Sequence, residues 1–214
     1  MEDVLEVYAR PYNSSRPVVC VDEVSKELHS TPHGQIAIEP GVPACVDYEY
    51  ARHGTANLFM SVEPLAGRRE VRVTDRRTAK DFAEELRLIV DIDYPDAEMV
   101  VLVSDNLNTH KLASLYEAFP ATEARRIARK IEWHYTPEHG SWLMTKQVLS
   151  DIAECELSVL SRQCLDRRIC DVIALQSEVE AWKCARNVNQ AKVSWQFTAE
   201  DARIKLRRLY PALK

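Results

Sequence analysis

Short apolar runs without helical spacing predict the strands of this chain. The clearest is Met99–Val103 (MVVLV), which suits a strand buried on both faces. Pro17–Val21 (PVVCV) has the same character. Thr55–Val62 and Arg69–Thr74 flank the turn-forming sequence EPLAG, which predicts a hairpin. Ile131–Tyr135 completes a set of short strands.

Helical periodicity separates these strands. Phe82, Leu86 and Ile89 recur at helical spacing after Thr78, a residue type that caps helix N-termini. The same reasoning predicts helices over 112–130 with a break near Pro120, over 145–165, over 171–186, and after a capping box at Thr198-x-x-Asp201.

The order of these elements is strand, hairpin, helix, strand, helix, strand, helix. It predicts an α/β fold: a ribonuclease H-like mixed sheet flanked by helices, in which the first and fourth strands are neighbours. An inserted hairpin follows the first strand, with 44–52 as an edge strand or hairpin arm, and a helical tail ends the chain. We expect 1–16 to be a linker remnant, 17–170 to form the ribonuclease H-like domain, and 171–214 to form a C-terminal helical extension.

Composition narrows the class of protein. The 214 residues suffice for one core, and 46% hydrophobic with 29% charged residues is typical of a soluble globular protein. No apolar run approaches the ~20 residues of a membrane span, and the acidic start MEDVLEVY is not a signal peptide, which predicts a cytoplasmic protein. The six cysteines form no C-x-x-C pair and indicate reduced core residues rather than a zinc site.

Charge is unevenly distributed along the chain. The formal net charge is −5, yet from Leu160 onward eleven Lys and Arg face only six Asp and Glu, so the preceding part is strongly acidic. An acidic body with a basic tail is compatible with metal-binding carboxylates in one part and phosphate contacts in the other. A solvated surface would explain it as well.

Acidic residues end two of the predicted strands. Asp22 closely follows 17–21, and Asp105 follows 99–103. If the first and fourth strands are neighbours, the two carboxylates meet at one edge of the sheet. Asp105 could instead only cap the next helix. A two-metal phosphoryl-transfer site needs a further acid from a separate element, and the late helix offers Asp151, Glu154, Glu156 and Asp166.

Several motifs are distributed along the chain: VDEVSK, DYEYARHGTANLF, EPLAGRREVRVTDRRTAKDF, LVSDNLNTH, HYTPEHGSWL, ECELSVLSRQCLDRR and WQFTAEDARIKLRRLYP. Together they resemble the catalytic half of bacterial insertion-sequence transposases of the mariner-related group. The resemblance covers about residues 17 to 213. It implies a DDE domain whose catalytic and metal-binding acids are Asp22, Asp105 and Glu154.

The resemblance also implies the chemistry. Such enzymes use two Mg²⁺ or Mn²⁺ ions to cut DNA strands at transposon ends and to transfer the freed 3′-hydroxyl to target DNA. The implied partner is double-stranded DNA, bound by a homodimer in the bacterial cytoplasm at the nucleoid, with no membrane involved. Glu23, beside Asp22, could assist metal binding, although a solvated neighbour is the simpler interpretation.

The chain departs from the family pattern in two places. Residues 1–16 are too short for the helix-turn-helix region that recognises transposon ends. The family's Trp-Leu-Asn motif lacks its Asn at Trp142-Leu143, and about seven residues are added before Glu154, nearly two helical turns or ~10.5 Å. Glu154 keeps its place only if the downstream apolar stripe through Leu157 and Leu160 sets the helix register, which we expect.

Positive and polar residues near these acids are candidate DNA contacts. Arg76, Arg77 and Lys80 lie at the start of a helix, where positive charge is unfavourable unless an anion is near. Turn residues and a solvated helix face would explain the remaining candidates equally well. They are Asn108, His110, Arg162, Arg167 and Arg168.

Two other functions stay open. A catalytically inactive transposase remnant would bind DNA or an intact transposase without cutting. Another ribonuclease H-like nuclease would explain the carboxylates but not the motifs of the tail.

Overall fold

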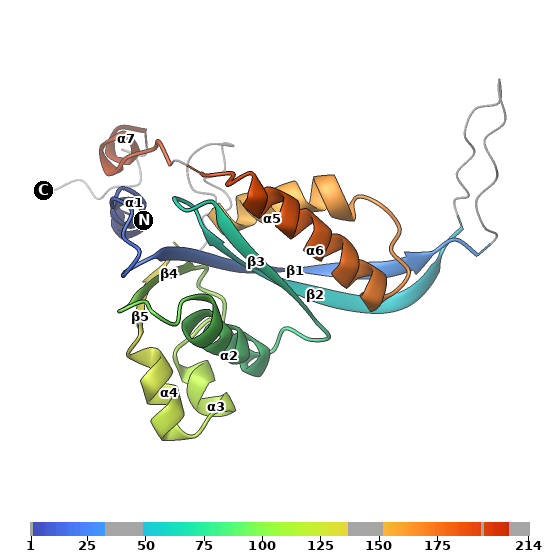
Figure 1. Ribbon diagram of the computed structural model, residues 1–214, viewed down its shortest axis with the longest axis horizontal. Helices are drawn as coiled ribbons and strands as arrows, with labels where there is room; N and C mark the ends of the chain where they lie inside the picture. The colour runs from blue at the N-terminus through green and yellow to red at the C-terminus, as the bar shows by residue number, and fades with distance from the viewer. Residues whose placement is uncertain (1, 33–48, 137–151, 194, 206–214) are drawn as a thin grey trace, which may run out of the picture.

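A five-stranded mixed sheet with helices on both faces forms the body of this computed structural model (Figure 1). The structure describes residues 2–32, 49–136, 152–193 and 195–205. The strand order is β3-β2-β1-β4-β5. The strands are β1 (Val18–Ser30), β2 (Ala51–Glu63), β3 (Arg68–Thr74), β4 (Val100–Ser104) and β5 (Ile131–Tyr135).

Helices lie on both sides of this sheet. In Figure 1, α5 and α6 cover one face, and α2, α3 and α4 cover the other. No helix in the described ranges is long and apolar enough to cross a membrane. The helices are α1 (Glu2–Tyr8), α2 (Ala79–Leu88), α3 (Ala113–Ala118), α4 (Ala121–Ala128), α5 (Ile152–Leu160), α6 (Val172–Val188) and α7 (Ala199–Lys205), with π-helical turns at η1 (Ile89–Asp93) and η3 (Ser161–Leu165).

The predicted fold class is confirmed by the strand pairing. β1 pairs with β4 in parallel, with Val21 opposite Ser104, so the first and fourth strands are neighbours. β2 and β3 form the predicted antiparallel hairpin. Its turn needs Gly67, since φ is +71° and an added Cβ would lie 2.7 Å from the backbone of Gln190.

β1 and β2 are longer than predicted. They pair as far as Ser30 and Ala51 and form a two-stranded arm that extends beyond the helices (Figure 1). The sequence 25–30 is too polar to indicate a strand, but tertiary contacts hold it: Lys26 Nζ donates to the carbonyl of Leu165 (2.6 Å). Most of the strand predicted at 44–52 lies outside the described residues, and its end is the beginning of β2.

The local boundary signals are confirmed. Thr78 caps α2 and forms a capping box with Asp81, and the capping box of Thr198 with Asp201 is also present. Pro120 separates α3 from α4, as predicted. The helix predicted over 145–165 is described only from Ile152, where α5 begins.

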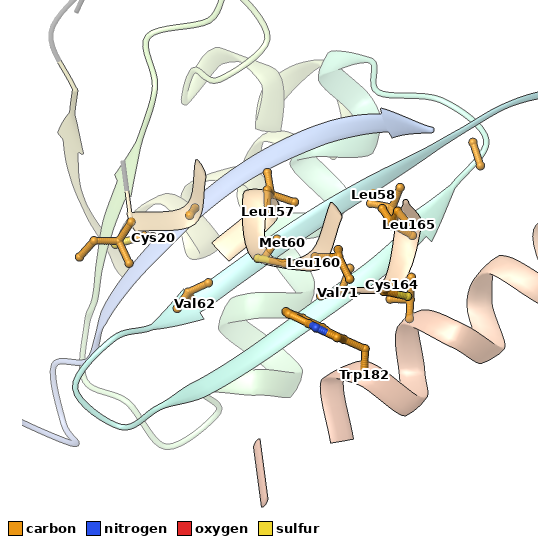
Figure 2. Packing of buried hydrophobic residues seen from close by; sticks show 14 of the residues in the cluster. Cys20, Leu58, Met60, Val62, Val71, Leu157, Leu160, Cys164, Leu165 and Trp182 are labelled. Atoms are coloured by element: carbon orange, nitrogen blue, oxygen red, sulfur yellow. The ribbon is translucent and has the colours of Figure 1, made fainter. Parts of the chain in front are cut away.

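Two apolar cores flank the sheet because strand residues alternate between its faces. Cys20 and Met60 face the core under α5 and α6, and Val19 and Val21 face the core under α2 to α4. Figure 2 shows Leu157 and Leu160 of α5 over the strands, with Trp182 of α6 beside them. The stripe that was expected to set the register of this helix is therefore buried.

Part of the segment expected to be a linker is a packed helix. Val4, Leu5 and Val7 of α1 are buried, and α1 contacts β5 and α7. A polar contact also links α1 to β5, because a carboxylate oxygen of Asp3 lies 2.7 Å from His134 Nδ1. Three apolar residues in one short amphipathic turn are too few to indicate a core helix by themselves.

A buried ion-pair network joins β3, α5 and α6. Arg69 is fully buried, and its Nε donates to Glu156 (2.6 Å). Arg186 of α6 donates to the same carboxylate at 2.8 Å. Asn187 binds both the backbone N–H and the carbonyl of Arg69. This network fixes the rotation of α5 about its axis, in addition to the apolar stripe.

Replacing Glu156 is expected to destabilise the fold. Glu156→Ala leaves two guanidinium groups without their carboxylate, one of them fully buried, and should cost about 3–5 kcal/mol of unfolding free energy. Glu154→Ala, on the exposed side of the same helix turn, should change it by less than about 0.5 kcal/mol. Urea unfolding measures both values, and a near-neutral Glu156→Ala would contradict this role of the network.

A second prediction concerns acid stability at β5. Glu132 accepts from Arg10 (2.7 Å) and contacts Arg16 and His134; the Arg10 hydrogen bond chiefly lowers its pKa to about 2. A depressed pKa stabilises the fold above the ordinary value of 4.5, and this contribution is lost as pH falls from 4.5 to 2. The group is partly exposed, so screening reduces the effect to about 1 kcal/mol. Glu132→Gln should lack this part of the pH dependence of chemical unfolding, and an identical pH profile would contradict the prediction.

Candidate active site

Asp22 lies in β1, at the carboxyl end of its pairing with β4. The alternation that sends Cys20 into the core under α5 places Asp22 on the same face. Its Oδ1 accepts from the N–H of Glu23 (2.8 Å). Burial, together with the charges of Glu23 and Asp105, raises the pKa of Asp22 to about 7. The ionised carboxylate is therefore costly at this position unless a cation balances it.

Asp105 directly follows β4 and faces the same edge of the sheet. The pairing of Val21 with Ser104 places Asp22, which lies within β1, beside the end of β4, and Asp22 and Asp105 are close enough to interact electrostatically. Oδ1 of Asp105 accepts from the N–H of Leu107 (3.2 Å) and contacts His110 Nδ1. Burial opposes ionisation, but the hydrogen bond and charge of His110 outweigh it and lower the pKa of Asp105.

His110 lies between two carboxylates inside the protein. Its side chain is 1% exposed and that of Glu23 is 3% exposed, with His110 Nε2 2.8 Å from Glu23 Oε2. The ring stacks on Phe82 of α2, with centroids 4.1 Å apart. Burial lowers the pKa of His110, but the contacts with Asp105 and Glu23 outweigh it and raise the pKa to about 9.

These positions correct two interpretations from the sequence. Glu23 is a buried partner of His110 rather than a solvated neighbour of Asp22. His110 was predicted as a DNA contact, but its ring is enclosed and holds Asp105 instead. The five-residue separation of Asp105 and His110 across one short loop is the signal in the sequence that could have indicated this contact.

The structure does not bring Glu154 into a group with the two aspartates. Glu154 is exposed in the first described turn of α5, on the helix that covers the face of Asp22. Within the described ranges, no three His, Cys, Asp or Glu side chains form a group that could hold a metal ion. The assignment of Glu154 therefore stays a prediction. Of the other candidates in this region, Glu156 pairs with Arg69, Asp166 is exposed, and Asp151 lies outside the described residues.

Basic residues surround the start of α2, near the site. Arg76, Arg77 and Lys80 are all exposed. Arg77 NH1 lies 3.8 Å from Glu23 Oε1, which places this end of the helix beside the buried carboxylate. Asn108 is exposed on the loop that carries His110. These residues remain available for contact with an anionic ligand.

The basic residues after α5 have structural contacts. Arg167 pairs with Glu178 of α6, and Arg162 of η3 donates to the carbonyl of Ser158 in α5 (3.2 Å). Arg168 donates to Thr31 Oγ1 (3.0 Å) and so ties this region to the two-stranded arm. Their predicted contact with DNA is untested.

Comparison with known proteins places this site in a family. Residues 17–176 match the family described as DDE superfamily endonuclease. The chain belongs to that family. No curated protein matches this chain.

Solved structures of Mos1 share the fold. The Mos1 strand transfer complex matches with a TM-score of 0.53 and 13% identity over 94% of this chain and 58% of that chain. The Mos1 mariner paired-end complex with Mn matches with a TM-score of 0.53 and 15% identity over 94% and 60%. These TM-scores show a fold similar to the ribonuclease H-like fold of Mos1 transposase. This chain spans less than two thirds of the Mos1 chains that it matches.

Asp22 is predicted to destabilise the protein in the absence of metal. Its pKa, raised from 3.8 to about 7, means that the ionised side chain costs folding free energy once pH rises through that range. In EDTA at pH 8, Asp22→Asn should therefore be more stable than the wild type by about 2–4 kcal/mol. The difference should become small near pH 3, below the unfolded pKa of 3.8, where folded and unfolded carboxyls are both mostly protonated. Urea unfolding at the two pH values tests this, and a destabilised variant at pH 8 would refute it.

Proposed function

We propose that this chain is the catalytic core of a DDE transposase that cleaves DNA strands and transfers them with the help of divalent metal ions. One observation carries the proposal. In a member of the DDE endonuclease family, Asp22 in β1 and Asp105 after β4 lie close together where the parallel pairing of these two central strands ends. This is the edge at which open α/β sheets place ligands and chemistry.

The carboxylates of Asp22 and Asp105 fit Mg²⁺ or Mn²⁺ as ligands, and Glu154 stays the predicted third ligand of a two-ion site. Carboxylate oxygens are the ligands that these hard cations prefer, and the raised pKa of Asp22 marks a carboxylate that lacks a compensating positive charge. Asp22, Asp105 and Glu154 would hold the ions. When bound, such ions activate the attacking oxygen and stabilise the leaving oxygen of a phosphodiester.

The chain's own residues supply orientation and charge. His110 holds Asp105 in place, and Arg76, Arg77 and Lys80 offer exposed positive charge for DNA phosphates. The substrate in this proposal is double-stranded DNA, including transposon ends and target, bound by a homodimer. The similar Mos1 structures are paired-end and strand transfer complexes, which supports this assignment. The proposed location is the nucleoid in the bacterial cytoplasm.

A cleavage assay tests the catalytic assignment. The purified protein is expected to nick supercoiled DNA when Mn²⁺ is added, and Asp105→Asn should reduce nicking to background because it removes a metal-binding charge. Asp91→Asn is the matched control: Asp91 pairs with Arg126 (2.7 Å) on a helical surface and should leave nicking unchanged. Equal activity in wild type and Asp105→Asn would refute the assignment.

Binding of DNA by the start of α2 is tested separately. Arg77→Ala should weaken binding of a duplex and lower the slope of log affinity against log salt by about 0.9, the value expected for one lost phosphate contact. Arg87→Ala is the control, because Arg87 lies at the other end of α2 and pairs with Glu84. If the salt dependence of DNA affinity were unchanged in Arg77→Ala, Arg77 would not contact a DNA phosphate, and this would contradict the proposed contact at the start of α2.

A catalytically inactive remnant that binds DNA or an intact transposase is the second candidate. The exposed position of Glu154, outside any group with Asp22 and Asp105, favours it. This function predicts DNA binding with the same dependence on Arg77 but no Mn²⁺-dependent nicking. The two assays above therefore separate the candidates.

A further inference from the structure

We propose that Glu23 and His110 form a positioning relay, Glu23–His110–Asp105, which orients the Asp105 carboxylate and thereby sets the affinity of the site for divalent metal. The proposal rests on the proposed function in one respect, namely that Asp105 binds metal. Neither Glu23 nor His110 needs to contact the metal or the DNA. Both are positioning residues.

The relay is a series of polar contacts from the buried Glu23 side chain through His110 to the half-exposed Asp105. His110 Nδ1 contacts Asp105 Oδ1, and His110 Nε2 lies 2.8 Å from Glu23 Oε2. Since the side chains of Glu23 and His110 are 3% and 1% exposed, water does not compete for the contact between them, whereas the Asp105 carboxylate is 44% exposed. Each ring nitrogen of His110 therefore lies beside one carboxylate: Nδ1 hydrogen-bonds Asp105, and Nε2 makes an ion-pair contact with Glu23 without hydrogen-bond geometry. The imidazole thus bridges β1 and the loop after β4.

The ring itself is held from its face. Phe82 stacks on His110 with an interplanar angle of 27°, and Phe82 in turn contacts Phe59 of β2 and Trp133 of β5. The loop supports the ring as well, because the N–H of His110 donates to the carbonyl of Leu107 (2.9 Å). The histidine is therefore anchored to the sheet and to α2 and has little freedom to follow movements of Asp105.

The contacts at Asp105 leave one oxygen for a ligand. In the described part of the chain, both hydrogen bonds accepted by this carboxylate fall on Oδ1, one from the N–H of Leu107 and one from His110. Oδ2 is not used in either contact. A carboxylate held by one oxygen in this way presents the other in a fixed direction, as outer partners of metal ligands commonly do.

Packing alone does not account for this arrangement. Burying an ionisable acid and a histidine together costs several kcal/mol of desolvation that an apolar pair would avoid. The surrounding core is apolar, with Val19, Val21 and Phe82 among its members, and could accept such a pair. The polar series ends at Asp105, the predicted metal ligand.

The test compares two replacements of His110 that mimic different ring nitrogens. Asn places its amide N–H near the position of Nδ1, and Gln places its amide near that of Nε2. His110→Asn should retain the contact with Asp105 and lower Mn²⁺ affinity by less than about 3-fold. His110→Gln should lose that contact and lower Mn²⁺ affinity by about 10–100-fold, the usual effect of removing an outer partner of a metal ligand. Electron paramagnetic resonance of free Mn²⁺ measures both affinities.

Matched controls separate the relay from general loss of structure. His134 also lies between two carboxylates, Asp3 and Glu132, and His134→Asn should leave Mn²⁺ affinity unchanged. Thermal unfolding without metal reports the stability of each variant. A purely structural role of His110 predicts equal Mn²⁺ affinities for the Asn and Gln variants, and that result would overturn the proposal. Folded wild-type protein that binds no Mn²⁺ would overturn it too.

A spectroscopic readout is independent of cleavage. The His110 Nδ1 proton should give a strongly downfield proton resonance in the metal-free protein, lost in Asp105→Asn and shifted in Glu23→Gln. Its absence from the wild type would overturn the relay. If the resonance and the Mn²⁺ affinities behave as expected but the wild type does not nick DNA, the relay stands and the proposed catalytic function fails.

Discussion

The parallel pairing of β1 with β4 is the constraint on which the candidate site depends. Val21 lies opposite Ser104, so Asp22 and Asp105 leave the pairing at the same edge of the sheet. Both strands carry apolar residues on both faces, in two separate cores. A slip of one residue would exchange those faces and bury the wrong set of side chains. The relative position of the two aspartates is therefore as well determined as the packing of the sheet.

The region around Asp22 and Asp105 contains more acidic than basic side chains. Asp22, Glu23 and Asp105 come together around one buried histidine. His110 compensates Asp105 and contacts Glu23, while burial and the neighbouring acids leave Asp22 with a raised pKa. A site that holds uncompensated carboxylates costs stability, which is a common property of functional sites. The excess of negative charge is what a divalent cation would neutralise.

Glu154 and Glu156 point to different sides of α5 because the ion pairs of Glu156 fix the rotation of this helix. Glu156 faces inward, to Arg69 and Arg186. Residues two apart on a helix are turned by about 200°, so an inward Glu156 directs Glu154 to another side, where it is exposed. The three predicted acids therefore differ in how they are held. Asp22 and Asp105 are positioned by the paired strands of the sheet. Glu154 lies in the first described turn of α5, a helix that is anchored through Glu156 on a different face.

The sequence by itself determined the order of the strands along the chain, the hairpin, the caps of α2 and α7, the break at Pro120 and the proximity of Asp22 to Asp105, but not the full length of β1 and β2. Apolar periodicity, capping and turn chemistry act over a few neighbouring residues, and can be recognised without knowledge of the rest of the chain. Only the tertiary structure decided that Glu23 and His110 are buried together, that α1 packs on β5, and that Glu156 rather than Glu154 faces inward. Each of these depends on a partner far away in the chain, because burial and ion pairing are set by whichever elements the fold brings alongside.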